Sequence, residues 1–106
     1  MDRRHFLAAA GAASTTLALP AYAQAKPIRI IVPFAAGGAI DVTTRLIAEK
    51  AATTLGTTIL IENKPGAGGG IGVDAVAKAA PDGQTLGIAA VAMHAINPWL
   101  FKKLTY

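Results

Sequence analysis

The chain has 106 residues, of which 53% are hydrophobic, 15% are charged and 6% are aromatic, and it contains no cysteine. This composition excludes a disulfide scaffold, a cysteine-ligated metal site and a charge-rich disordered tail. The formal net charge of +4 is mild, and after the first few residues the basic side chains are scattered rather than gathered on one segment, so we expect no nucleic-acid partner.

Residues 1–25 have the organisation of an export signal. A basic start with Arg3-Arg4 precedes an uncharged stretch over residues 7–19, and Ala21-Tyr22-Ala23 supplies the small residues that a signal peptidase recognises. The arginine pair resembles a twin-arginine signal, with general secretion as the alternative. The apolar stretch is much shorter than the roughly 20 residues that span a bilayer. We therefore predict a signal peptide at 1–25, a folded part at 26–106 and no stable membrane insertion after cleavage.

The folded part alternates strand-like and helix-like segments. Three short runs rich in β-branched residues are predicted strands: 28–34, 57–62 and 85–91. Two runs with helical spacing of apolar residues are predicted helices, at 40–55 and 71–80, and Asn97-Pro98 has the form of an N-cap and first residue of another. This order predicts an open parallel α/β sheet. Three strands are few for such a sheet, so we expect the chain to be an incomplete first part of a larger lobe.

Two turns that are poor in side chains follow the first two predicted strands, at 35–39 and 65–70. In an open parallel sheet such turns lie at the carboxyl edge, where the first N–H groups of each helix lack partners and attract anions. The N–H groups expected to face a shared carboxylate, or a phosphate, are those of Gly37, Gly38, Gly68 and Gly69. The alternative is that these glycines only supply the positive φ angles of tight turns.

Asp41 and Lys64 are the charged residues closest to these turns in the sequence. If Gly38 is the N-cap of the first helix, Asp41 is its third residue, and its carboxylate can reach back to the free amides. The functional alternative is that Asp41 orders the loop and a water that touches the ligand. Lys64 would steer anions, or simply be a solvated lysine.

The residues needed for catalysis are scarce. Residues 26–106 contain no serine and no cysteine, and His94 is their single histidine, so we predict no catalytic residue and no metal site. A loose dinucleotide motif at Gly70-x-Gly72-x-x-Ala75 lies at or beyond the start of the predicted helix, and no acidic residue follows at the end of the next strand. A nucleotide- or dinucleotide-binding half-domain of an α/β enzyme is the alternative function.

Four motifs in this order resemble the Bug, or TctC-like, substrate-binding receptors of tripartite tricarboxylate transporters: PFAAGGAID at 33–41, ENKPGAGG at 62–69, APDGQTL at 80–86 and AINPWL at 95–100. The resemblance implies lobe 1 of a type II periplasmic binding protein fold, in which two α/β lobes enclose a cleft. It further implies a periplasmic receptor without cofactor or enzymatic activity. Such a receptor binds a small organic carboxylate and presents it to the membrane subunits of the transporter.

By position, the resemblance also implies the ligand-binding residues. The first turn would hold the ligand carboxylate through the backbone of Phe34, Ala35, Gly37 and Gly38, with waters ordered partly by Asp41. The second turn would add Ala67, Gly68 and Gly69, and residues 90–94 would line the cleft. The sequence departs from the family at Gln84, Trp99 and Phe101 and in its short length. Without a second lobe, binding is expected to be weak or absent.

Overall fold

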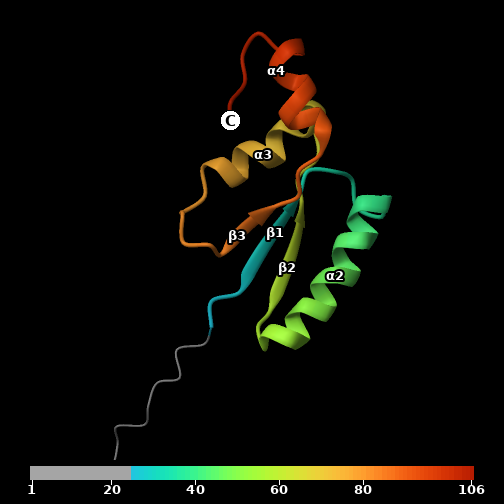
Figure 1. Ribbon diagram of the computed structural model, residues 1–106, viewed down its shortest axis with the longest axis vertical. Coiled ribbons are helices and arrows are strands. Elements are labelled where there is room, and N and C mark those ends of the chain that lie inside the picture. Colours follow the sequence, from blue (N-terminus) through green and yellow to red (C-terminus); the bar gives the residue numbers. More distant parts are fainter. Residues whose placement is uncertain (1–24) are drawn as a thin grey trace, which may run out of the picture.

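The computed structural model describes residues 25–106, which form a three-stranded parallel sheet with helices on both faces (Figure 1). The elements in chain order are β1 (Ile28–Val32), α2 (Ala39–Leu55), β2 (Ile59–Asn63), the 3₁₀ turn η2 (Ala67–Gly69), α3 (Gly70–Ala77), β3 (Thr85–Gly87), the π-helical turn η3 (Ala92–Ile96) and α4 (Asn97–Leu100). The predicted open parallel α/β sheet is confirmed. The predicted export signal lies outside the described residues, apart from its last position.

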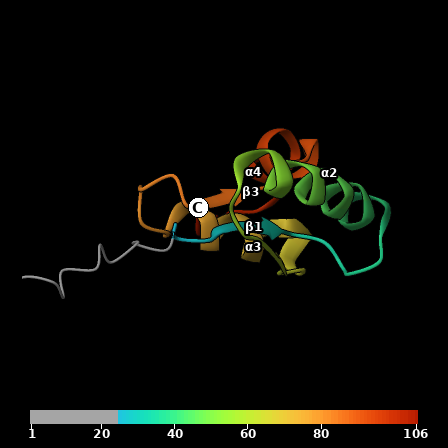
Figure 2. The ribbon, with the colours of Figure 1, turned by 90° about the horizontal axis from the view of Figure 1, so that it is seen from below.

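The strand order is β2-β1-β3, so the first strand of the described chain is the central one. It pairs in parallel with β2 from Ile28–Ile59 to Val32–Asn63, and with β3 from Arg29–Thr85 onward. The crossover from β1 to β2 through α2 and the crossover from β2 to β3 through α3 run in opposite directions along the sheet. Because parallel crossovers are right-handed, α2 and α3 cover opposite faces, as Figure 2 shows on either side of β1. Because all three strands are parallel, their carboxyl ends lie at one edge of the sheet. The strand order reverses beside β1, and open α/β sheets bind their ligands at such a point.

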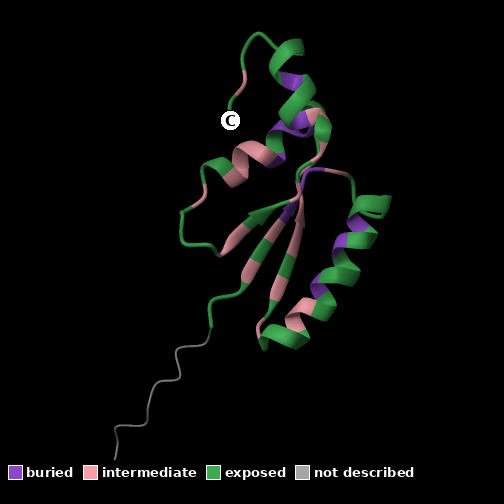
Figure 3. Ribbon diagram, viewed as in Figure 1, coloured by how far each residue is buried: buried purple, intermediate pink, exposed green. Residues whose placement is uncertain are grey.

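Burial is concentrated near this carboxyl edge. The buried apolar side chains are those of Ile31, Val32, Pro33, Ala48 and Met93, and the buried polar ones are those of Asp41, Thr44 and Asn97. Figure 3 shows the buried segments at the end of β1, along one side of α2 and at the start of α3. Many large apolar side chains elsewhere stay exposed, Trp99 and Val91 among them. The best-packed part of the described chain thus lies directly beneath the turns that leave β1 and β2.

The three predicted strands and one predicted helix are shorter in the structure; the strand predicted at 57–62 is β2 at Ile59–Asn63. β1 ends at Val32 because Pro33 has no N–H to donate to the sheet. β3 ends at Gly87; the Ile88 N–H still donates to the Ile31 carbonyl (3.0 Å), but the alanine-rich sequence that follows forms η3 instead of a strand. The helix predicted at 71–80 ends at Ala77, ahead of Pro81. None of the helices within residues 25–106 combines the length and hydropathy that spanning a bilayer requires.

Candidate functional site

The first glycine turn, residues 34–38, connects β1 to α2. Gly37 has φ of 82°, a left-handed conformation that a glycine adopts without cost. Gly38 is the N-cap of α2, and the first helical hydrogen bond runs from the Val42 N–H to the Gly38 carbonyl (2.9 Å). The N–H groups of the first helical turn therefore precede the hydrogen-bonded ladder and lie at the carboxyl edge of the sheet, where they attract negative charge.

Asp41 is the centre of the polar contacts beneath this turn, and only 2% of its surface is exposed. Its Oδ2 accepts hydrogen bonds from the Gly37 N–H (2.9 Å) and Arg45 Nε (3.0 Å), and its Oδ1 accepts one from Asn63 Nδ2 (2.8 Å). These donors, Arg45 foremost, lower the pKa of Asp41 from 3.8 to about 2. The predicted capping role of Asp41 is confirmed. The Gly37 N–H is thereby already engaged, which differs from the prediction that it is available to a ligand.

Asn63 and Arg45 complete the contacts around Asp41. Asn63 Nδ2 donates to the Phe34 carbonyl (3.1 Å) as well as to Asp41, while Arg45 Nη2 donates to Asn63 Oδ1 (2.9 Å). We refer to Asp41, Arg45 and Asn63 as the polar triad. The last residue of β2 is thus tied to the turn that follows β1. Sequence reasoning missed both partners of Asp41, although the spacing of four residues between Asp41 and Arg45 is that of a helical ion pair.

The second glycine turn, residues 66–69, connects β2 to α3 through four consecutive positive φ angles: Gly66 (122°), Ala67 (50°), Gly68 (62°) and Gly69 (86°). Gly69 is buried, its N–H donates to the Gly66 carbonyl (2.9 Å), and a Cβ added to it would overlap the Met93 side chain. Its N–H is therefore engaged within the turn instead of facing a ligand as predicted. Packing, together with backbone conformation, determines the shape of this turn.

Asn97 holds the second turn from the other side. Its side chain is buried, and its Nδ2 donates to the Gly68 carbonyl (3.1 Å) and contacts Tyr106 Oη (3.2 Å), which in turn donates to the Met93 carbonyl (2.8 Å). The prediction that Asn97 is an N-cap is wrong, because the chain is already helical in η3 and Asn97 is the first residue of α4. Its amide is therefore free to reach across to Gly68.

The predicted site residues fall into two accessibility groups. Asp41 and Gly69 are buried and Phe34 is half-buried, whereas the remaining predicted residues are exposed: Ala35, Gly37, Gly38, Ala67 and Gly68. Both turns follow paired neighbouring strands and therefore lie at the same edge. Lys64 is engaged by Glu62 (2.9 Å), whose pKa is lowered by Lys64 and Arg29. The interpretation of Lys64 as a free anion-steering charge is therefore not favoured.

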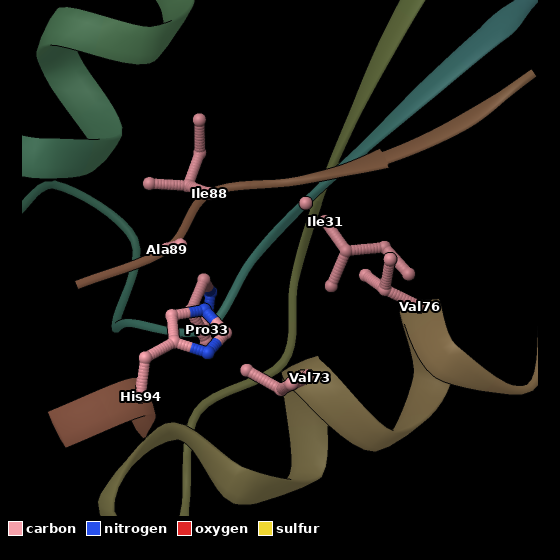
Figure 4. A pocket seen from close by; sticks show the side chains of 9 residues that line it. Ile31, Pro33, Val73, Val76, Ile88, Ala89 and His94 are labelled. Atoms are coloured by element: carbon pink, nitrogen blue, oxygen red, sulfur yellow. The ribbon is translucent and has the colours of Figure 1, made fainter. Parts of the chain in front are cut away.

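The segment predicted to line the cleft contributes His94 to an apolar cavity of about 100 Å³. Figure 4 shows His94 beside Pro33, the residue that precedes the first turn, with Val73 and Val76 of α3 across the cavity. Gly72 lets α3 come this close, since a Cβ there would lie 2.6 Å from the Pro33 Cβ. Within residues 25–106, no group of three His, Asp or Glu side chains is placed to hold a metal ion.

Comparison with known proteins identifies the family. Residues 43–106 match the model of the family described as "Tripartite tricarboxylate transporter family receptor". The chain belongs to this family. The family is one of receptors, in agreement with the prediction that the chain is not an enzyme, and the alternative of an enzyme half-domain is not supported.

Relatives within the receptor family are considerably longer than this chain. The "UPF0065 protein in gbd 5'region" of Cupriavidus necator is 42% identical over 104 residues, covering 89% of this chain and 32% of the relative. Protein BugT of Bordetella pertussis is 47% identical over 81 residues, covering 76% and 24%. The chain thus spans a quarter to a third of the length of these relatives.

Solved structures of the receptor family share this fold. A protein described as a periplasmic transporter superposes with a TM-score of 0.74 at 48% identity, covering 81% of this chain and 29% of that one. MatC of Rhodopseudomonas palustris with bound malate gives 0.70 at 46% identity, and an R. palustris protein with adipate gives 0.71 at 34%, each covering 76% of this chain and 27% of the other. The predicted resemblance is confirmed.

Proposed function

We propose that this chain forms one wall of a site for a small organic carboxylate in an extracytoplasmic receptor that performs no chemistry. One observation carries the proposal: two exposed turns with little or no side chain leave neighbouring parallel strands at the same edge of the sheet. An anion can approach the backbone closely there, beside the N-terminus of a 17-residue helix. The malate and adipate in the structures of two relatives support a carboxylate as the ligand.

In this proposal the exposed backbone of the first turn receives one carboxylate oxygen, with Ala35 and Gly38 as the contributing residues and waters completing the shell. The Gly38 N–H makes a long hydrogen bond to the Ala35 carbonyl (3.4 Å), and it would exchange this bond for one to the ligand. Ala67 and Gly68 of the second turn add further contacts. Phe34, Gly37, Asp41 and Gly69 act mainly by shaping the two turns, since their polar groups are engaged or buried. The charge of Asp41 does not repel the ligand strongly because Arg45 lies against it.

The rest of the receptor's biology is part of the same proposal. Residues 1–25 serve as the export signal, residues 26–106 belong to the first α/β lobe, and the receptor works in the periplasm. It delivers its ligand to the membrane subunits of a tripartite tricarboxylate transporter. The family and the sequence of the leader support these points.

The decisive test uses a chimera in which residues 26–106 replace the corresponding segment of MatC. We expect this chimera to bind malate in calorimetry, and Gly38→Val to weaken binding by about a hundredfold, because a branched side chain would fill the space left for the anion. The fold should tolerate the change: Gly38 has φ of −71°, and an added Cβ meets only the Ala35 carbonyl oxygen at 3.4 Å.

The matched control is Thr58→Val, which introduces the same side chain at the opposite edge of the sheet, and binding should then be unchanged. Two results would contradict the proposal. One is a folded chimera that binds none of malate, adipate and succinate. The other is a Gly38→Val chimera that binds malate as tightly as its parent.

A further inference from the structure

We propose that Arg45 and Asn63 are positioning residues of the carboxylate site, which fix the first glycine turn through Asp41 and the Phe34 carbonyl. This inference rests on the proposed function and concerns residues that touch no ligand themselves. It begins from the arrangement of the polar triad, in which two elements far apart in the sequence hold one short turn from beneath.

Asn63 has a fixed position and a fixed orientation. Its backbone lies opposite Val32, the last residue of β1, and the following Lys64 N–H donates to the Val32 carbonyl (2.8 Å). Its side chain is oriented by chemistry at both ends, since Arg45 can only donate and a carboxylate can only accept. The amide oxygen must therefore face Arg45 and the amide nitrogen must face Asp41. The sheet and the triad together leave Asn63 one arrangement.

The bond from Asn63 to the Phe34 carbonyl determines the direction of the next N–H. A trans peptide places the carbonyl and the following N–H on opposite sides of the chain. Because the Phe34 carbonyl points toward Asn63 (3.1 Å), the Ala35 N–H points away from Asn63 and from β2. Ala35 is exposed. Asn63 therefore directs the Ala35 N–H toward the open side of the turn, where this group can donate a hydrogen bond to the proposed carboxylate.

Arg45 supplies the charge that makes Asp41 compatible with an anion above it. Its Nε lies 3.0 Å from Asp41 Oδ2, and its Nη2 extends to Asn63. Without the guanidinium, the buried Asp41 carboxylate would repel the negative charge of the ligand. Asn63 would also lose the hydrogen bond from Arg45 that holds its side chain in place. Arg45 itself is about half exposed, so its replacement removes these contacts without opening a cavity in the core.

The experiment compares Arg45→Gln and Asn63→Ala in the MatC chimera. Each is expected to weaken malate binding about tenfold, the loss that corresponds to one hydrogen bond to a charged group. The double variant should bind only slightly less tightly than either single variant, because the two residues act as a unit. Asn63→Asp should weaken binding most, since it places a second carboxylate against Asp41.

A spectroscopic measurement separates positioning from general stability. In the 106-residue chain without ligand, the amide signals of Gly37 and Ala35 should move in Arg45→Gln and Asn63→Ala. Lys78→Gln is the matched control: it breaks an ion pair between Lys78 and Asp74 with the same helical spacing, on α3. It should move neither signal and leave malate binding unchanged.

The outcomes distinguish this inference from the proposed function. If the parent chimera binds malate and both variants bind it within twofold of the parent, Arg45 and Asn63 do not position the site. The same conclusion follows if Lys78→Gln weakens binding as much as Arg45→Gln. A parent chimera that is folded and binds no carboxylate would instead contradict the proposed function itself. Arg45→Gln keeps the test decisive if Asn63→Ala does not fold.

Discussion

The two glycine turns occupy equivalent places in the fold but are held by different forces. The first turn contains a single positive φ angle, at Gly37, and is fixed by hydrogen bonds and charge through the polar triad. The second contains four consecutive positive φ angles and is fixed by contact with Met93 and by the buried amide of Asn97. The contribution of the first turn to stability should therefore depend on pH, and the first turn should accept an added side chain at small cost. The second turn should show no such pH dependence and should be strongly destabilised by an added side chain.

The largest difference is expected between Gly69→Ala and Gly37→Ala. Both residues have similar φ angles, 86° and 82°, so each alanine adds backbone strain of about 1 kcal/mol. Only at Gly69 does the new methyl group also overlap Met93, whereas at Gly37 it meets nothing within 4 Å. We expect Gly69→Ala to lower the free energy of unfolding by about 3 kcal/mol and Gly37→Ala by about 1 kcal/mol in urea titrations. Equal losses would show that packing does not distinguish the turns.

A smaller loss is expected from Asn97→Ala. The substitution leaves the Gly68 carbonyl without its donor and removes the contact with Tyr106. The free energy of unfolding should fall by about 1–2 kcal/mol, which is typical of a buried hydrogen bond broken on one side. Thr54→Ala is the control, because the Thr54 hydroxyl bonds to a carbonyl on the exposed side of α2, and its loss should change stability by less than about 0.5 kcal/mol. An Asn97→Ala variant with an unchanged free energy of unfolding would show that Asn97 does not stabilise the second turn.

The third difference is one of pH dependence. The pKa of Asp41 is about 2 in the folded chain, below the ordinary 3.8, so its contribution to stability is complete above about pH 4 and is lost as the pH falls toward 2. The stability gap between the wild-type chain and Asp41→Asn should therefore shrink over this window. Glu62 and Asp82 also have lowered pKa values. They are present in the wild-type chain and in Asp41→Asn alike, so their effect cancels in the difference between the two.

The control for this measurement comes from the second turn. The gap between the wild-type chain and Asn97→Ala should stay constant over the same window, since Asn97 contacts a backbone carbonyl and a hydroxyl group and no carboxyl group. Urea titrations at pH 5, 4, 3 and 2 measure both gaps. An Asp41→Asn gap that is constant, or that widens in acid, would contradict the charge-based description of the first turn.

Local signals account for what the sequence predicted correctly. The runs of β-branched residues predicted the three strands, and the glycines predicted both turns. The position of Asp41 three residues after Gly38 predicted its capping role. The contacts made by Asn63 and Asn97 could not be predicted in this way. Asn63 reaches Asp41 because β2 pairs with β1 in one register, and Asn97 reaches Gly68 because η3 redirects the chain after β3. Both depend on residues distant in sequence.

The position of β1 at the centre of the sheet has a consequence for how the chain folds. Ile28 pairs with Ile59 and Arg29 pairs with Thr85. Both strand pairings therefore join residues that are far apart in the sequence, and a long loop must form before either pairing can begin. Sheet assembly should accordingly be slow compared with the formation of α2. Until β3 arrives, β1 keeps one side of its backbone unpaired, and any self-association of partly folded chains should begin along that side.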